Sequence, residues 1–463
     1  MVKLDSQQPD IPMTMHHSPI HRREALKMGG LGALASALAF TSAKEQAAAA
    51  EYEKATRGDA PLKITRVRPI LTNPQGQRLV VVKVETSEPG LYGLGCATYN
   101  QRPLAVATAV EKYLDPFARD RSAENIEDLW QNAYTSSYWR NGPVLNNALS
   151  GLDMALWDIK GKRANMPVYQ LFGGKARFAA DCYSHASGRD HQQLDDSVAS
   201  KIEQGFRHVR IQLGSYGSSH LSSKADFKEA GFGLPRDSHM DPGPYIKATI
   251  AMFDHVRNKF GDEIELLHDI HERISPMDAI RLLKAVETYR PFFIEDPVAP
   301  EDNGWFKTLR QHSSVPIAMG ELFNNPHEWV ELITGRLIDY IRVHLSQIGG
   351  LTPARKLAAL AEWFHVKSAW HGPGDVSPVG HAANVHLDLA IPNFGIQEYS
   401  PFRDSTREVF PGCPTMTNGY LHVSDAPGLG VDIDEKLAAQ HPYPDDPGFW
   451  KPIRRRDGTA VRP

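Results

Sequence analysis

The sequence predicts an α/β protein built on a (β/α)8 barrel that follows a smaller α+β domain. The prediction depends on short apolar runs that recur along the second half of the chain, on helical stretches between them, and on acidic residues behind three of the runs. Asp269, Glu295 and Glu321 are each 26 residues from the next. A strand, a loop and a helix together take about this length in a barrel repeat. The interval therefore indicates three successive strand ends.

Eight segments in the second half of the chain are expected to form the strands of the barrel. Active sites of such barrels lie where the strands have their C-terminal ends, so the polar residues there should meet at one place. The predicted strand ends are Tyr183–His185, Val209–Gln212, Leu267–Asp269, Ile294–Glu295, Met319–Glu321, Ile341–His344, Ala369–His371 and Ile396–Glu398. A long polar insertion, Gly214–Pro244, separates the second and third units, and loops of that length usually have a function or are disordered.

The region that precedes the barrel has a mixed pattern. Val80–Val84 is rich in β-branched residues and is expected to form a strand. Leu145–Ala164 carries apolar residues at a helical period and is expected to form a long helix. The predicted organisation is an export signal over 1–50, a linker over 51–62, an α+β domain over 63–177, the barrel over 178–400 and a C-terminal segment over 401–463.

The three spaced carboxylates also predict a metal site. An isolated acidic residue at a strand end is commonly a helix cap or a solvated charge, but three in register behind apolar runs would converge. Carboxylate oxygens are hard ligands that suit Mg²⁺, which keeps water or substrate in its remaining positions. Asp269, Glu295 and Glu321 are therefore the predicted ligands.

Composition restricts the partners of the protein. The chain has 463 residues, of which 41% are hydrophobic and 23% charged, an ordinary globular mixture. A formal net charge of −4 indicates no basic surface for nucleic acid, so a small polar molecule is the expected partner. The three cysteines are widely scattered and predict no disulfide framework.

The first fifty residues have the layout of a bacterial export signal. The paired arginines Arg22 and Arg23 precede a weakly apolar run, Met28–Phe40, and Ala47–Ala50 could supply a cleavage site. Paired arginines in this position are typical of twin-arginine signals, which indicates a periplasmic protein with no membrane segment once the signal is removed. The alternative is a disordered basic tail with a short helix.

Several longer motifs resemble one family. They are Tyr138–Pro143, Asp153–Lys160, Tyr169–Gly174, His371–Pro373 and Pro392–Tyr399, with Gly428–Glu435 towards the end of the chain. From about Lys63 to Asp434 the chain resembles the enolase superfamily, and within it the mannonate dehydratase branch, which includes starvation-sensing and galactonate dehydratase family proteins. The resemblance implies a modified TIM-type barrel, an N-terminal capping domain to which the C-terminal segment returns, and homo-oligomeric assembly.

The resemblance also implies a reaction. Members of the superfamily use Mg²⁺, here on Asp269, Glu295 and Glu321, to stabilise the enediolate that forms when the proton beside a carboxylate is removed. The racemases and lactonising enzymes carry Lys-x-Lys on the second strand, where this chain has Arg210-Ile211-Gln212. In mannonate dehydratases the corresponding Arg acts with a Tyr of the following loop as the base, and a His two residues after the first ligand, here His271, protonates the leaving hydroxyl.

Five further positions match family residues that contact the substrate. Arg342, His371 and Glu398 lie at predicted strand ends, and Asn100 and His185 lie in the capping domain and at the first strand. The expected activity is therefore dehydration of a six-carbon aldonate, such as mannonate or gluconate, to a 2-keto-3-deoxy acid.

The chain departs from the family in the loop after Arg210. The family's catalytic Tyr comes about twelve residues after this Arg, whereas Tyr216 comes six residues after it and His220 follows. Tyr216 is the predicted base, and His220, or no base at all, is the alternative. Two other functions stay open: an epimerase or dehydratase of another carbohydrate acid, and a non-catalytic acid-sugar binding or sensing protein.

Overall fold

The computed structural model describes residues 61–214, 240–445, 453–455 and 457–462. Contacts between residues group Leu62–Pro463 into one compact unit. The predicted export signal, nearly all of the predicted linker, and the candidate bases Tyr216 and His220 lie outside the described residues.

The prediction of a barrel with a preceding α+β domain is confirmed. Seven parallel strands pair in chain order, the eighth pairs with the first, and a bridge from Ser368 to Phe394 closes the ring. The strands are β4 (Ala180–Gly188), β5 (His208–Leu213), β6 (Glu265–Asp269), β7 (Phe293–Glu295), β8 (Ile317–Met319), β9 (Tyr340–Ile341), β10 (Lys367–Ser368) and β11 (Gln397–Glu398).

One layer of apolar side chains fills the interior of the barrel. It is formed by Tyr183, Leu267, Phe293, Ala318, Tyr340, Ala369 and Ile396. The strands are short and buried on both faces, which explains why the sequence reads there as continuous apolar runs rather than as alternating ones. Because the layer excludes water from the interior, polar side chains can be placed only beyond it, at the strand ends.

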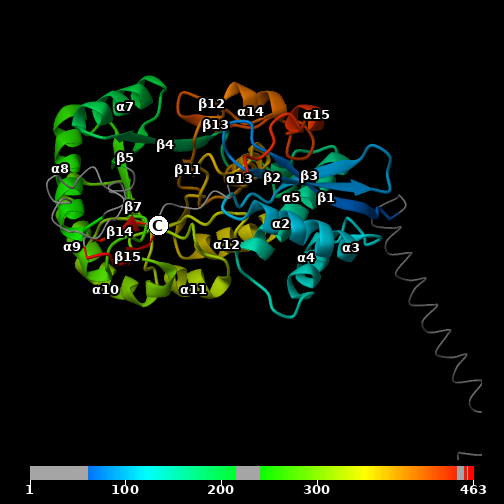
Figure 1. Ribbon diagram of the computed structural model, residues 1–463, viewed down its shortest axis with the longest axis horizontal. Coiled ribbons are helices and arrows are strands. Elements are labelled where there is room, and N and C mark those ends of the chain that lie inside the picture. Colours follow the sequence, from blue (N-terminus) through cyan, green and yellow to red (C-terminus); the bar gives the residue numbers. More distant parts are fainter. Residues whose placement is uncertain (1–60, 215–239, 446–452, 456, 463) are drawn as a thin grey trace, which may run out of the picture. The chain divides into compact units, whose positions relative to one another are not determined.

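Helices surround the strands, as Figure 1 shows for α7 to α11. Three of them begin in the same way, with a side-chain cap followed by proline: Ser275 before Pro276, Asn325 before Pro326, and Ser377 before Pro378. The helices and 3₁₀ turns of this region are α7 (His191–Glu203), α8 (Pro242–Phe260), α9 (Pro276–Val286), η2 (Glu287–Tyr289), η3 (Pro300–Trp305), α10 (Phe306–His312), α11 (Pro326–Thr334), α12 (Leu351–Trp363) and α13 (Pro378–Ala390).

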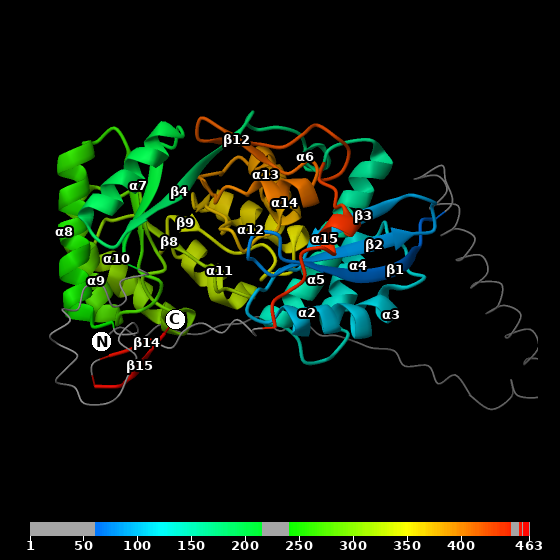
Figure 2. The same cartoon turned by 45° about the horizontal axis from the view of Figure 1, so that its top comes forward.

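The α+β domain consists of an antiparallel sheet covered by helices (Figure 2). The predicted strand lies within β2, and the predicted helix is α5. A Cβ atom on Gly95 would stand 2.0 Å from the carbonyl oxygen of Gly151, so glycine allows α5 to pack directly on β3. The elements are β1 (Ile64–Thr72), β2 (Leu79–Thr86), β3 (Tyr92–Cys96), α2 (Pro103–Ala109), the π-helix η1 (Val110–Leu114), α3 (Asp115–Ala118), α4 (Ile126–Thr135), α5 (Pro143–Ala164) and α6 (Val168–Leu171).

Hydrogen bonds join α5 to the barrel helix α12. The buried Asp153 carboxylate accepts from the backbone N–H of Thr352 at 3.0 Å, and Trp157 Nε1 donates to the hydroxyl of the same threonine at 3.0 Å. Thr352 lies in the first turn of α12, where backbone N–H groups have no partner within the helix. The α+β domain therefore supplies the cap of a barrel helix, which orders the chain just after β9.

The C-terminal segment contacts both parts of the unit. Strands β12 (Thr415–Thr417) and β13 (Tyr420–His422) form a hairpin, and β13 pairs with β4. Glu435, in α15 (Glu435–Ala438), accepts from Arg68 at 2.7 Å and from Lys83 at 2.8 Å, both in the α+β domain. The remaining elements are α14 (Asp404–Val409), β14 (Ile453–Arg454) and β15 (Ala460–Val461). No helix in the described ranges is both long and apolar enough to cross a membrane.

The buried carboxylate of Asp158, on α5, should stabilise the packing of α5 against β3 and against the C-terminal segment. Asp158 accepts from the backbone N–H groups of Leu94 at 2.9 Å and Leu429 at 2.7 Å, and from Lys162 Nζ at 2.7 Å. Asp158→Ala leaves these donors without their acceptor, so we expect the free energy of unfolding to fall by about 3–5 kcal/mol. Urea denaturation monitored by circular dichroism measures this.

The matched control is Asp254→Ala, which removes an exposed carboxylate on α8. It should change the free energy of unfolding by no more than about 0.5 kcal/mol. If Asp158→Ala cost as little as this control, the structural role given to Asp158 would be wrong.

Candidate active site

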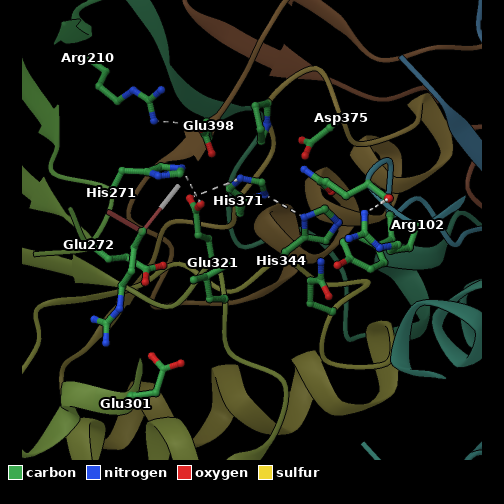
Figure 3. Close-up of a pocket in the computed structure, with 16 residues that line it drawn as sticks. Arg102, Arg210, His271, Glu272, Glu301, Glu321, His344, His371, Asp375 and Glu398 are labelled. Atoms are coloured by element: carbon green, nitrogen blue, oxygen red, sulfur yellow. Dashed lines mark hydrogen bonds and ion pairs between the residues drawn. The ribbon is translucent and has the colours of Figure 1, made fainter. Parts of the chain in front are cut away.

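Polar residues line a cavity of about 600 Å³ at the C-terminal ends of the barrel strands. Five of the predicted site residues belong to its wall: Arg210, His271, Glu321, His371 and Glu398. In Figure 3, His271 and His371 point toward Glu321 from opposite sides. The charged and imidazole side chains of the wall are Arg102, Arg210, His271, Glu272, Glu301, Glu321, His344, His371, Asp375, Glu398 and Arg462.

The interior layer explains why these residues gather there. Leu267 is followed two positions later by Asp269, Phe293 by Glu295, and Tyr340 by Arg342. The same spacing relates Tyr183 to His185 and Ile396 to Glu398. Successive strand residues point to opposite faces, so a residue two positions on returns to the same face. Each polar residue therefore stands over the apolar layer, on the inner side of the barrel.

Two buried arginines bind the carboxylates of this polar layer. Arg210 Nη1 lies 3.1 Å from Asp269 Oδ2, 2.9 Å from Glu295 Oε2 and 3.5 Å from Glu398 Oε1. Arg342 is fully buried, and its Nη2 lies 2.7 Å from Glu398 Oε2 and 3.3 Å from Glu295 Oε2. The two guanidinium groups therefore share Glu295 and Glu398 between them.

Arg342 also binds two carboxylates with its other terminal nitrogen. Nη1 donates to Asp296 Oδ2 at 2.9 Å and forms an ion pair with Glu321. The carboxylates around it raise the pKa of Arg342 well above its usual value, although burial acts in the opposite direction. Arg342 is thus a permanent cation at the centre of four carboxylates.

The donor set fits a hard divalent cation. Asp269 and Glu295 stand opposite each other in the pairing of β6 with β7, and Glu321 follows β8 by two residues. Glu295 Oε1 is buried and has no hydrogen-bond partner among the described residues. In the described ranges no group of three His, Cys, Asp or Glu side chains is arranged to hold a metal ion as it stands. Arg210 contacts Asp269 and Glu295, and Arg342 contacts Glu321.

His271 reaches the cavity through a turn rather than along the strand. Strand β6 ends at Asp269, so strand alternation does not decide where His271 points. His271 and Glu272 instead adopt left-handed backbone conformations, with φ of 55° and 57°, and His271 N donates to Asp269 Oδ1 at 2.8 Å. This tight turn brings His271 Nε2 to 3.5 Å from Glu321 Oε1. Strained backbone of this kind is common at functional sites.

His185 lies behind the wall of the cavity rather than in it. Its Nε2 is 2.7 Å from Glu398 Oε1, and its Nδ1 is 3.2 Å from Arg210 Nη2. Burial and the neighbouring Arg210 lower the pKa of His185. A neutral imidazole here links the two charged groups and orders both.

Asn100 is not brought into the cavity wall. Its side-chain amide nitrogen donates to Gln77 Oε1 at 3.2 Å, while its neighbours Tyr99, Gln101 and Arg102 line the cavity. The loop after β3 therefore does reach the site, but the residues that line the cavity are the neighbours of Asn100 and not Asn100 itself.

The electrostatics of the wall differ from one carboxyl group to the next. Burial alone would raise the pKa of Glu321, but His371, Arg342 and His271 lower it to about 2. Burial raises the pKa of Glu272 to about 8, with Glu321 and Glu301 adding to the effect. Glu321 is thus held ionised while Glu272 is kept protonated near neutral pH.

Several wall residues were missed by the sequence argument. His344 lies in the predicted strand end Ile341–His344 but was given no role, and the structure places it in the cavity wall. Asp375 follows His371 by four residues in a loop, and Arg462 belongs to the C-terminal segment. Asp296 stood beside a predicted ligand but was given no role, although it binds Arg342.

Comparison with known proteins places these residues in a family context. Residues 193–437 match the model of the enolase C-terminal domain-like family. Residues 55–173 match the N-terminal domain of the mandelate racemase and muconate lactonizing enzyme family.

The chain matches individual relatives over nearly the whole length of each relative. The D-galactonate dehydratase family member RspA of Pantoea ananatis is 53% identical over 412 residues, which span 86% of this chain and 99% of the relative. A member from Salmonella enteritidis is 52% identical over 417 residues, spanning 87% of this chain and 99% of the relative.

Solved structures agree with these matches. An enolase from Pantoea ananatis, crystallised with bound D-gluconate and Mg, superposes with a TM-score of 0.82 at 53% identity and covers 87% of this chain and 100% of that one. An enolase from Agrobacterium radiobacter, bound to Na and L-malate, gives a TM-score of 0.74 at 27% identity, covering 86% and 99% of the two chains.

The guanidinium of Arg342 should be essential to the stability of the metal-free protein. Arg342→Met leaves four carboxylates close together without their shared positive charge, so we expect the free energy of unfolding in the presence of chelator to fall by about 3–5 kcal/mol. Urea denaturation measures the change. Arg281→Met, which breaks an exposed pair with Asp278 at 3.2 Å, is the control and should stay within about 0.5 kcal/mol of wild type. Equal effects for the two variants would contradict the role of Arg342.

Proposed function

Because the chain belongs to the D-galactonate dehydratase family of the enolase superfamily, we propose that it is a Mg²⁺-dependent dehydratase of six-carbon aldonates. Gluconate and mannonate are the substrates to test first, and the products are 2-keto-3-deoxy acids. One observation carries the proposal: the carboxylate and arginine cluster beside the cavity, in a chain 53% identical to an enolase that binds D-gluconate and Mg.

The three strand-end carboxylates are the proposed holders of the metal. Asp269, Glu295 and Glu321 offer only hard oxygen donors. Asp269 and Glu295 are buried, whereas Glu321 is partly exposed and lines the cavity. When bound, Mg²⁺ supplies positive charge that offsets the second negative charge developed on a carboxylate when its α-proton is removed. Superfamily sites of this type pair the metal with a base supplied by the protein.

We assign the proton steps to the loop after Arg210 and to His271. The candidate bases for the C2 proton, Tyr216 and His220, follow in sequence Arg210, whose guanidinium reaches the wall. A nearby cation favours the phenolate form of a tyrosine. His271 is the proposed acid, which donates a proton to the 3-hydroxyl so that it leaves as water. Its place 3.5 Å from Glu321 keeps this donor beside the proposed metal ligand.

The remaining polar residues hold the substrate. His371 and Glu398 line the cavity next to Glu321 and Arg210, and they present a hydrogen-bond donor and acceptors to hydroxyl groups. Arg342 is too deeply buried to line the cavity, so its proposed role is to orient Glu398, to which it donates at 2.7 Å. This differs from the direct substrate contact expected from the sequence.

A screen of acid sugars tests the proposed activity. The Mg²⁺-loaded protein is incubated with hexonates that cover the C2 to C5 stereoisomers, and 2-keto-3-deoxy acids are measured. We expect turnover of at least one aldonate, and a loss on the order of 10²-fold or more with Glu295→Gln, since one developing charge loses its support. Glu362→Gln, an exposed change on α12, should keep wild-type activity.

Three results would contradict the proposal. Solvent deuterium entering C2 without loss of water would indicate an epimerase. Tight aldonate binding with no turnover across the series would indicate a binding or sensing protein. Wild-type activity of Glu295→Gln in the presence of chelator would remove the metal from the reaction.

We also propose that the protein is exported to the periplasm. The proposal depends on Arg22 and Arg23 with the apolar run behind them, which lie outside the described residues. A C-terminally tagged full-length protein should be found, shortened, in the periplasmic fraction, and replacement of both arginines by lysine should retain it in the cytoplasm. Full-length wild-type protein confined to the cytoplasm would rule this out. The expected homo-oligomeric assembly stays a prediction.

A further inference from the structure

A second cavity, of about 600 Å³, lies on the α+β domain, where η1, α3 and α4 meet the first turns of α5. Four aromatic side chains and a leucine form much of its wall: Tyr113, Phe117, Tyr134, Trp139 and Leu145. None of the described residues that line this cavity is charged, whereas charged groups gather in the wall of the candidate active site. The second cavity therefore suits an apolar occupant and not an acid sugar.

Large apolar side chains at the rim of this cavity are exposed to solvent. Tyr113 has 71% of its surface exposed, Tyr138 has 77% and Trp139 has 81%, and Leu145 is exposed as well. Tyr138 and Trp139 lie edge to face with their ring centroids 5.2 Å apart, so the two rings form one apolar projection beside the cavity. Contiguous apolar surface of this kind marks an interaction site. We call the surface formed by these four residues the aromatic patch.

The loop that carries the projection is held by hydrogen bonds. Tyr138 has a left-handed backbone, with φ of 63°, which is costly for a bulky residue, and its N–H donates to Thr135 O at 3.1 Å. Asn146 Nδ2, on α5, donates to Asn141 Oδ1 at 3.1 Å and to Gln347 O of the barrel at 2.8 Å. An ordered loop loses little conformational freedom on binding, so its aromatic side chains are preorganised for a contact.

The size of the aromatic patch matches the apolar share of a stable dimer interface. Aromatic side chains bury about 150–250 Å² each, so three that are mostly exposed, together with Leu145, offer on the order of 500 Å². A standard interface takes about 800 Å² from each partner, of which about 57% is apolar. The patch thus offers the apolar area that one partner contributes to such an interface, whereas a small molecule in the cavity would leave the projection exposed.

The aromatic patch is also self-complementary. A projection and a cavity stand side by side on one face, so a two-fold axis between two copies can seat each projection in the cavity of its partner. The exposed charges of the rim have both signs, since Glu111 and Lys112 precede Tyr113 and Arg140 follows Trp139. A two-fold contact therefore has opposite charges available at its rim. A membrane surface is less suitable, because anionic lipids attract clustered basic residues.

We propose that the aromatic patch is the contact surface between two copies of this chain, with Tyr138 and Trp139 of each copy seated in the cavity of the other. This interface gives a role to the motif Tyr138–Pro143, which the proposed reaction does not use. It also assigns a surface to the homo-oligomeric assembly expected from the sequence. The interface is independent of the proposed dehydratase function, because no residue of the patch lines the candidate active site.

The mass of the full-length protein, measured by sedimentation equilibrium, tests the interface. The wild-type protein should contain an even number of copies. Trp139→Glu places a carboxylate in the centre of the contact on both copies, so we expect the dissociation constant of the pair to rise about 100-fold or more and the mass to fall to half or less. The matched control is Trp363→Glu, because Trp363, at the end of α12, is also 81% exposed, and it should keep the wild-type mass. A monomeric wild-type protein, or equal masses for the two variants, would overturn the proposal.

Hydroxyl-radical footprinting of the same proteins identifies what covers the patch. In the wild-type protein the oxidation of Tyr113 and Tyr138 should become on the order of tenfold faster when dilution separates the copies, because water is excluded from the centre of an interface. Trp139→Glu should show the faster rate without dilution, and the rate at Trp363 should stay the same throughout. Protection that persists in a monomer would mean that another part of this chain covers the patch, and an unprotected wild-type assembly would mean that nothing covers it. Either result would contradict the proposal.

Discussion

The interaction on which the site depends is the binding of several buried carboxylates by two arginines. Ionised carboxylates crowded in a water-poor interior repel one another, and each carries a large desolvation cost. Arg210 and Arg342 offset both effects, since each contacts more than one carboxylate and the two share Glu295 and Glu398. Although burial acts in the opposite direction, Arg342 lowers the pKa of Glu321 and of Glu398 and so favours the ionised form of both carboxyl groups.

The cluster is held in place by the layer beneath it and by the domain beside it. The apolar layer of the barrel carries the polar residues two positions further along the strands, so the packing of Phe293 or Tyr340 also decides the height of Glu295 or Arg342. The α+β domain contributes by capping helix α12 through Asp153. The site is thus coupled to contacts that lie well outside the cavity.

Hydrogen bonds between site residues set chemical states as well as positions. The left-handed turn after β6 places His271 beside Glu321 and binds its backbone to Asp269. The contact between His344 and His371, with Nδ1 atoms 2.8 Å apart, joins the ends of two neighbouring strands. Such contacts let the same few side chains serve different proton-transfer or binding roles, because the neighbours decide which atom donates.

The sequence by itself determined the barrel, its eight strand ends and the position of Asp269, Glu295 and Glu321 at three successive ones, since these follow from apolar periodicity and a repeat length that are local properties of the chain. Only the tertiary structure decided which residues reach the cavity. Arg342 is buried behind the cavity wall, and Asn100 donates to Gln77 instead of lining the cavity. Asp375 and Arg462 line the cavity, although neither was expected to. Loop backbone and long-range ion pairs control these positions, and neither leaves a periodic signal in the sequence.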